Sequence, residues 1–390
     1  MKFLKVLLIL TIISFYGCGE KTDVTTGKDT TKTTGTQSTG EQFPDETIKR
    51  LDSVLNHAMM TDSIPGIIGG IWIPGKGEYT FSKGTSELGK DNPRTMDQNI
   101  RIGSITKTFT ATVFLQLCDE GKVALNDKLD KYFPQVPNAK DITMRMLLDM
   151  TSGLGDFLDA PVLDSAFFHV GNGDRKFTDE QILEISIKLP PVFSPGEQGK
   201  WNYSNINYLL LGMIIKKVTN NSWESEITER IIKKLNLTNT EVPTSANMPS
   251  PHAHGYMRDT STGEVKDVTI MEPSITGSAG CMISNINDLT IWSKALSDGT
   301  LLSDTMQAER MKLVPTYVMD FMKYGLGILD FVGFSGHNGG ITGFNTSMYY
   351  NEEKNALFIL NVNMFGRQGG VSDKIFTGLA KVIYPDMPWK

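Results

Sequence analysis

The alternation of apolar and polar residues divides the chain into strand-rich ends and a helical middle. Apolar residues at helical spacing follow Pro44, which predicts a helix over about 45–60. Two strands, over 67–73 and 78–82, are predicted next, joined by a glycine-rich turn. Towards the other end, the pattern predicts a closing amphipathic helix capped by Ser372, and before it strands over 324–331, 334–337, 344–350 and 355–362.

The stretch between these ends, about 123–275, has the pattern of helices and loops. The simplest architecture pairs the two strand-rich ends in one antiparallel sheet, with helices on its faces and the middle as a helical insertion. The sequence therefore predicts one mixed α/β (α+β) domain over about 45–385.

The first residues have the pattern of an export signal. Lys2 and Lys5 precede an apolar run over 6–16, which is too short to cross a bilayer as a helix. Residues 21–44 then contain almost no apolar side chain and cannot offset the entropy of ordering, so we expect a flexible tether. We predict a signal peptide over 1–17 and an exported protein.

Cys18 closes the apolar run and resembles the cysteine of the bacterial lipoprotein lipobox. The resemblance implies that Cys18 carries a lipid and that residues 18–44 tether the domain to a membrane at the cell envelope, in the periplasm or at the cell surface. Phe15 and Tyr16 stand where a branched aliphatic and a small residue are usual, so secretion without lipid is the alternative. In either case, any membrane attachment would come from the lipid alone.

Composition and charge narrow the function classes. The 390 residues, 39% of them apolar, suffice for one large domain or two ordinary ones. The net charge is −6 and the basic residues are spread along the chain, which argues against nucleic acid as a partner. Cys118 and Cys281 are expected to be buried free thiols, with one bridge between them as the alternative.

Ser104 and Lys107 form a Ser-x-x-Lys motif at the start of a predicted helix that ends at Gly121. Ser104 as an ordinary N-cap is the alternative, but a cation three residues later opposes both the capping preference and the helix dipole. Residues three apart share a helix face, so Lys107 can reach the Ser104 hydroxyl. Burial and the dipole favour a neutral amine that accepts the serine proton, while the helix-start amides would meet an oxyanion.

Tyr203 and Asn205 lie in a loop just before a predicted buried helix. The alternative is a core tyrosine with a capping asparagine. A second Tyr-x-Asn at 349–351 runs into a predicted hairpin turn and is discounted.

His337 is followed by Asn338, Gly339 and Gly340 at the end of a short predicted strand. The glycines would leave room for a substrate backbone along an edge strand, and the Gly340 amide would be a second oxyanion donor. An ordinary exit from strand to turn is the alternative, and a rival His-x-Gly at 169–171 lies in a polar loop.

In this order, Ser-x-x-Lys, Tyr-x-Asn and His-x-Gly resemble the serine hydrolases that include class C β-lactamases, D-alanyl-D-alanine carboxypeptidases and related esterases. The resemblance covers about 45–385, because further stretches match as well: 147–154, Pro195-Gly196 and 280–289. It implies a β-lactamase/transpeptidase-like fold and an acyl-enzyme that needs no cofactor.

The resemblance also implies a role for each motif residue. Ser104 would be the nucleophile, Lys107 its base and Tyr203 the proton relay to the leaving group. Asn205 would orient the substrate amide, and His337 would replace the usual lysine of the third motif. The substrate would lie along Gly339 and Gly340, with the amides of Ser104 and Gly340 as the oxyanion hole.

The third motif also bears on the choice of substrate. No Lys-Thr-Gly occurs in the chain, which favours a peptidase or esterase over a β-lactamase. The leading hypothesis is a D-alanyl-D-alanine carboxypeptidase acting on small peptides such as peptidoglycan stems. Esterases, amidases, class C-like β-lactamases and non-catalytic acyl-serine β-lactam sensors are the alternatives. If His337 faces a substrate carboxylate, its charge should affect the rate near pH 6.5.

A zinc site is the alternative for two further histidines. His252 and His254 alternate and could face one way on a strand, but no third ligand is identified. We predict no metal.

Overall fold

The computed structural model describes residues 40–168, 175–259, 262–365 and 370–389. The predicted signal peptide, Cys18, most of the tether and His169 lie outside the described residues, so the expectations placed on them stay predictions. The end of the predicted tether already belongs to the fold, because Gln42 pairs with Glu78 and Phe43 is buried.

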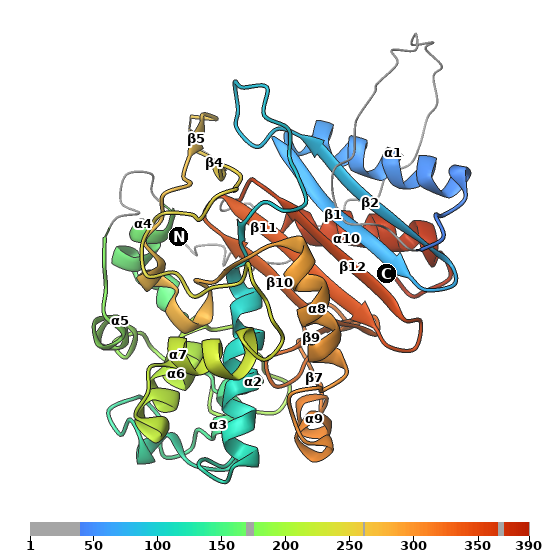
Figure 1. Cartoon of the computed structure of the whole chain (residues 1–390). Coiled ribbons are helices and arrows are strands. Elements are labelled where there is room, and N and C mark those ends of the chain that lie inside the picture. The colour runs from blue at the N-terminus through green and yellow to red at the C-terminus, as the bar shows by residue number, and fades with distance from the viewer. Residues whose placement is uncertain (1–39, 169–174, 260–261, 366–369, 390) are drawn as a thin grey trace.

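The core of the fold is an antiparallel sheet built from both ends of the chain. Within the described residues it has eight strands in the order β2-β1-β12-β11-β10-β9-β8-β7 (Figure 1). The strands are β1 (Gly66–Ile73), β2 (Gly77–Gly84), β7 (Val314–Pro315), β8 (Met322–Tyr324), β9 (Leu329–Phe331), β10 (Phe334–Ile341), β11 (Phe344–Asn351) and β12 (Ala356–Val362). β1 pairs with β12 over Ile67↔Val362 to Trp72↔Leu357, which confirms the predicted joining of the two ends.

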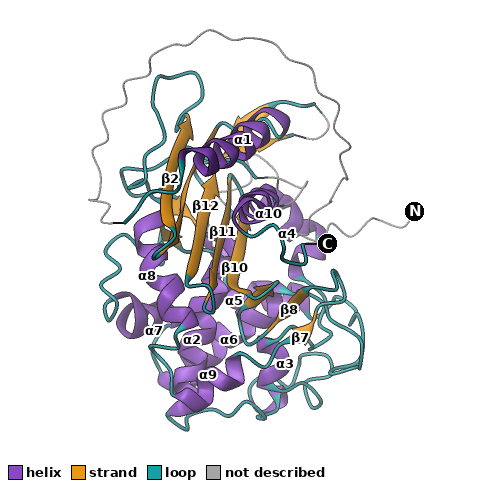
Figure 2. Cartoon of the chain, turned by 90° about the vertical axis from the view of Figure 1, so that its right-hand side faces the viewer, coloured by secondary structure: helices purple, strands orange, loops and turns teal. Residues whose placement is uncertain are grey.

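Helices cover both faces of this sheet, as predicted. α1 (Asp45–Thr61) and α10 (Val371–Ile383) pack together on one face, and α8 (Ile286–Ser297) packs on the other (Figures 1 and 2). The ring of Phe376 on α10 contacts Phe334 and Phe358 of the sheet, at centroid distances of 5.5 Å in both cases. These aromatic contacts join the closing helix to the sheet.

A helical layer lies beside the sheet and is centred on α2 (Thr106–Asp119) and α6 (Asn205–Thr219), which pack together. The other helices are α3 (Met144–Leu148), α4 (Pro161–Phe168), α5 (Asp179–Ser186), α7 (Trp223–Ile227) and α9 (Asp304–Arg310). Short turns of helix are η1 (Gly103–Ile105), η2 (Leu129–Lys131), η3 (Phe157–Asp159), η4 (Thr228–Ile232), η5 (Pro273–Ile275) and η6 (Gly277–Ala279). Two small strand pairs complete the fold, β3 (Ile100–Arg101) with β6 (Ile283–Ser284) and β4 (Tyr256–Arg258) with β5 (Val265–Asp267). The architecture is the predicted one, an antiparallel sheet built from both chain ends with a mainly helical part beside it.

Three details differ from the sequence prediction. The strand expected over 334–337 is longer, because β10 continues through the two glycines to Ile341. The expected strand over 324–331 is two strands, because the chain turns at Gly327 (φ +73°) to lie against α2, where a Cβ would be 2.2 Å from the Ala111 methyl carbon. Ser372 does not cap the last helix: Gly370 precedes the helix, and the Ser372 N–H donates to Asn345 Oδ1 at 2.7 Å.

Cys118 and Cys281 are free thiols, as expected, but only Cys281 is fully buried and Cys118 is partly exposed. Burial raises the pKa of each thiol, that of Cys118 to about 12. Among the described residues, none of the helices is both long and apolar enough to span a membrane.

Candidate active site

Ser104 lies in η1, the turn that leads into α2. The turn depends on Gly103, which has φ +53° and leaves no room for a side chain, since a Cβ there would lie 2.9 Å from Gly340 N. The residue preceding η1 is Ile102, and no side chain caps the turn, so the N-cap alternative for Ser104 is excluded. The first N–H groups of such a turn have no partner within it and remain available to a ligand.

Lys107 is completely buried and its amine contacts three oxygens. Nζ lies 3.0 Å from Ser104 Oγ, 2.7 Å from Asn205 Oδ1 and 2.7 Å from the Ala279 carbonyl oxygen. Burial lowers the pKa of Lys107 to about 7, although the negative charge of Asp156 acts to raise it. A substantial fraction of the amine is therefore neutral near pH 7, with a lone pair within hydrogen-bonding distance of the Ser104 hydroxyl.

Asn205, the first residue of α6, joins Lys107 to a partly buried acid. Its amide nitrogen donates to Asp156, at 2.8 Å to Oδ2 and 3.2 Å to Oδ1. The Asp156 carboxylate also accepts the Leu158 N–H at 3.0 Å and so caps η3. Burial raises the pKa of Asp156, while the Leu158 and Asn205 N–H groups and the Lys107 charge act in the opposite direction. The Asn205 carbonyl oxygen thus accepts a hydrogen bond from Lys107. The sequence had suggested that Asn205 contacts the substrate amide.

Tyr203 lies directly over the Lys107 amine, with Nζ 4.8 Å from the ring centroid. The Tyr203 hydroxyl is buried and has no hydrogen-bond partner among the described residues. Burial raises the pKa of Tyr203 well above 10, and the neighbouring Ser104 hydroxyl only partly offsets this, so the phenol is neutral. The ring packs against three others, those of Trp201, Tyr324 and His337.

His337 is buried in β10, and both of its ring nitrogens have partners. Nδ1 lies 2.5 Å from the Asn338 carbonyl oxygen, which can only accept, so Nδ1 carries the proton. Nε2 then accepts from the Tyr324 hydroxyl at 2.9 Å. Burial, and then the Lys107 charge, lower the pKa of His337 to about 3. His337 is neutral at physiological pH in this arrangement and offers no cation to a carboxylate here. The expected dependence of the rate on its charge stays a prediction.

The side of β10 that does not pair with β11 faces η1, the turn that contains Ser104. β10 runs to Ile341 within the sheet and is not an edge strand, but it pairs with β9 only as far as Gly336. A two-residue turn closes the β10–β11 hairpin at Ile341↔Phe344, so Ile341 and Gly339 bond to β11 while the Gly340 N–H points to the open side. The open side thus presents the Gly340 amide to Ser104.

Gly339 has a structural role that the sequence did not predict. A Cβ on Gly339 would lie 1.8 Å from the Ile102 carbonyl oxygen and 3.2 Å from Ser104 N. The glycine therefore lets η1 approach β10. The expected passage of a substrate backbone along Gly339 stays a prediction.

We expect Gly339→Ala to lower kcat/KM for a nitrophenyl ester by about 100-fold, because η1 and β10 must move apart and the Ser104 and Gly340 amides separate. The matched control is Gly370→Ala, whose new methyl would be 3.7 Å from its nearest neighbour, Asp373 Oδ2. Full activity of the Gly339→Ala protein, with a melting temperature equal to that of the control, would contradict this role.

Comparison with known proteins gives this arrangement a family. Residues 51–380 match the family described as Beta-lactamase. The chain belongs to the beta-lactamase family. The protein described as putative penicillin-binding protein PbpX of Bacillus subtilis is 28% identical over 321 residues, which cover 80% of this chain and 75% of that protein.

Two solved structures extend the comparison. A D-stereospecific amidohydrolase from Streptomyces sp. is 32% identical, covers 89% of this chain and 100% of its own, and has a TM-score of 0.76. The D-amino acid amidase from Ochrobactrum anthropi SV3, complexed with L-phenylalanine amide, is 26% identical, covers 87% and 98%, and has a TM-score of 0.75. The protein is thus a serine acyl-transferring hydrolase of the beta-lactamase fold.

The structure adds three groups to the site that the motifs did not predict. Asp156 follows the matched stretch 147–154 by two residues, and an acid before an apolar pair is a capping signal that could have drawn attention to it. Tyr324 was predicted only as a strand residue. The Ala279 carbonyl has no side-chain signature. The three motifs therefore do not contain every group that contacts the motif residues.

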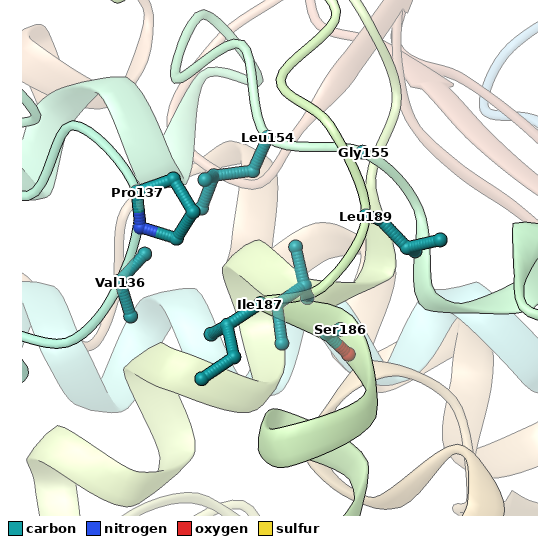
Figure 3. A pocket seen from close by; sticks show the side chains of 8 residues that line it. Val136, Pro137, Leu154, Gly155, Ser186, Ile187 and Leu189 are labelled. Carbon is teal, nitrogen blue, oxygen red and sulfur yellow. The ribbon is translucent and has the colours of Figure 1, made fainter.

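The histidine pair and a small cavity take no part in the contacts described above. His252 and His254 lie with ring centroids 5.9 Å apart, but His254 Nδ1 contacts Asp267 Oδ2 at 2.6 Å, and no cluster in the described residues could hold a metal ion. A small cavity behind Asn205 has room for about one water molecule. Its lining, shown in Figure 3, is mainly apolar: Val136, Pro137, Leu154, Gly155, Ser186, Ile187, Leu189 and Ile206.

Proposed function

We propose that the protein is an amidohydrolase that forms an acyl-enzyme on Ser104 and cleaves amide bonds of D-configured substrates whose leaving end is uncharged. The observation that carries this proposal is the state of His337, which is buried and neutral at the position where a cation was expected. Two structural neighbours, a D-stereospecific amidohydrolase and a D-amino acid amidase, support the D-configured substrate class.

The proposed reaction begins at Lys107. Its neutral amine takes the Ser104 proton, and Oγ attacks the substrate carbonyl carbon. The developing oxyanion is met by the N–H groups of Ser104 and Gly340. The Tyr203 hydroxyl, which has no partner among the described residues, gives its proton to the leaving nitrogen as the C–N bond breaks and takes one back from the Lys107 ammonium, which restores the neutral amine. Water then attacks the ester carbon while the Lys107 amine takes its proton. That proton passes to Ser104 Oγ as the ester C–O bond breaks, which releases the acid and restores the Ser104 hydroxyl.

A D-alanyl-D-alanine carboxypeptidase is the second candidate. It is favoured by the order of the three motifs and by the penicillin-binding relative. A terminal carboxylate would meet a neutral His337 in this site, which offers it no charge. Export, with a lipid on Cys18, is part of both proposals and would bring the enzyme close to envelope peptides.

The decisive substrates are D-alanyl-D-alanine amide and D-alanyl-D-alanine, which differ only in the charge of the leaving end. We expect kcat/KM for the amide to exceed that for the acid by at least about tenfold. We also expect the ratio of the two to stay level from pH 5 to 8, because the pKa of His337 is lowered to about 3 and the titration of Lys107 cancels in the ratio.

The carboxypeptidase proposal makes the opposite prediction for the same experiment. If His337 gains a proton when it meets a carboxylate, the relative rate on the acid should fall as pH rises through about 6.5. His337→Lys provides the control, since a retained cation should raise the relative rate on the acid at every pH in this range. A pH-dependent wild-type ratio would overturn the uncharged leaving end.

A further inference from the structure

A partly buried chain of hydrogen bonds connects Ser104 to an acid that none of the three motifs contains. It runs from Ser104 Oγ to Lys107 Nζ (3.0 Å), from Nζ to Asn205 Oδ1 (2.7 Å), and from Asn205 Nδ2 to Asp156 Oδ2 (2.8 Å). The four residues come from η1, from α2, from the start of α6 and from the cap of η3. No other acid is a partner in this chain within the described residues.

The chemistry of the carboxylate fixes the direction of the chain. An ionised carboxylate only accepts hydrogen bonds, so the NH₂ end of the Asn205 amide must face Asp156. The carbonyl end must then face Lys107. Without the acid, the amide is free to turn and to present its NH₂ group to the Lys107 amine, where two sets of donors would meet.

We propose that Asp156 is a positioning residue, whose carboxylate sets the orientation of the Asn205 amide and thereby holds the Lys107 amine against Ser104. This inference rests on the proposed role of Lys107 as the base. It assigns to Asp156 no contact with substrate.

The charges around Lys107 give the proposal a measurable consequence. Tyr203 and Tyr208 face the amine with ring centroids 4.8 and 5.7 Å away, and both are neutral phenols because burial raises their pKa values well above 10. His337 is neutral as well, which leaves Asp156 as the anion whose charge raises the pKa of Lys107 against burial. Asp159 is the like charge that acts on Asp156 itself. Removing the Asp156 charge should therefore lower the pKa of Lys107 below about 7.

The test is Asp156→Asn, with kcat/KM for a neutral nitrophenyl ester measured from pH 5 to 9. We expect kcat/KM to fall by about 10–100-fold through misplacement of the base. We also expect the rising limb of the profile to move to lower pH, because the base loses its proton more readily. A purely structural role would lower the rate without moving the limb.

Asp149→Asn is the matched control. Asp149 is a buried acid of the same segment, and its carboxylate accepts from the Thr151 N–H at 3.2 Å and the Thr151 hydroxyl at 2.5 Å. We expect the rising limb of the Asp149→Asn pH profile to stay at the wild-type position. If the rising limb of the Asp156→Asn profile also stays there, the inference is overturned.

The exchange variant D156N/N205D keeps the proposal testable if the single variant folds poorly. The amide at 156 can accept the Leu158 N–H and donate to the carboxylate at 205, which in turn accepts from Lys107. We expect kcat/KM of the exchange variant to exceed the value that results from multiplying the losses of the two single variants. We also expect the rising limb of its pH profile to move to higher pH, because the anion now contacts the Lys107 amine directly. Additive losses would overturn the coupling. If instead Lys107→Ala acylates at the wild-type rate, the proposed base fails, which is a separate result.

Discussion

Ser104→Ala is expected to abolish covalent labelling by a fluorophosphonate and to lower kcat by at least about 10³-fold. The acceptor oxygen for the acyl group is then gone, while the oxyanion donors and the binding surface remain. Labelling is followed on the intact protein by mass, together with turnover of a nitrophenyl ester. Labelling of the variant at the wild-type rate would remove Ser104 from the mechanism.

Ser303→Ala is the control for this result, because Ser303 is an ordinary capping serine. Its side chain accepts the Met306 N–H at the start of α9. Its loss should cost about 1 kcal/mol of stability and leave labelling unchanged. The wild-type protein also distinguishes an enzyme from an acyl-serine sensor, since a sensor would release one equivalent of product in a burst and then stop.

Much of the fold could be predicted because it depends on local patterns. The strands β1, β2, β11 and β12 alternate or run apolar between turn residues, and the amphipathic helices at both ends repeat every three to four residues. The Ser104–Lys107 contact is also local, since three residues span one helical turn. Pairing of the chain ends followed from the need to bury both sets of strands.

The rest of the site depends on contacts that no local pattern contains. Asp156 is 49 residues from Asn205 in the sequence, and Asn205 is 98 residues from Lys107. The neutral state of His337 results from burial on every side, which a histidine in the sequence does not reveal. Gly339 was predicted to matter, but its reason, the approach of the Ile102 carbonyl oxygen, appears only when β10 and η1 are in place. The motifs therefore indicated the family and the general type of hydrolase. The positions of charges and protons in the site depend on packing, which the motifs do not contain.

We expect Lys107→Arg and Lys107→Ala each to slow acylation by about 10²–10⁴-fold, the range for loss of a general base. The arginine retains a cation in the site but does not give up its proton, so it separates the base from the charge. The alanine leaves the Asn205 and Ala279 oxygens without their donor, which should cost about 1–3 kcal/mol of stability. Thermal unfolding of both variants separates that cost from the loss of rate.

The wild-type pH profile tests the same base without any substitution. Protonated Lys107 cannot accept the Ser104 proton, so kcat/KM for a neutral ester should rise about tenfold per pH unit at low pH and level off above its pKa of about 7. The plateau should continue to pH 9, because the pKa of Tyr203 is raised well above 10 and the phenol keeps its proton. In Lys107→Ala this limb should vanish, and a small primary amine added to the buffer should restore part of the rate by entering the space left by the side chain. A limb that persists near pH 7 in the alanine variant would assign the titration, and the proton transfer, to another group.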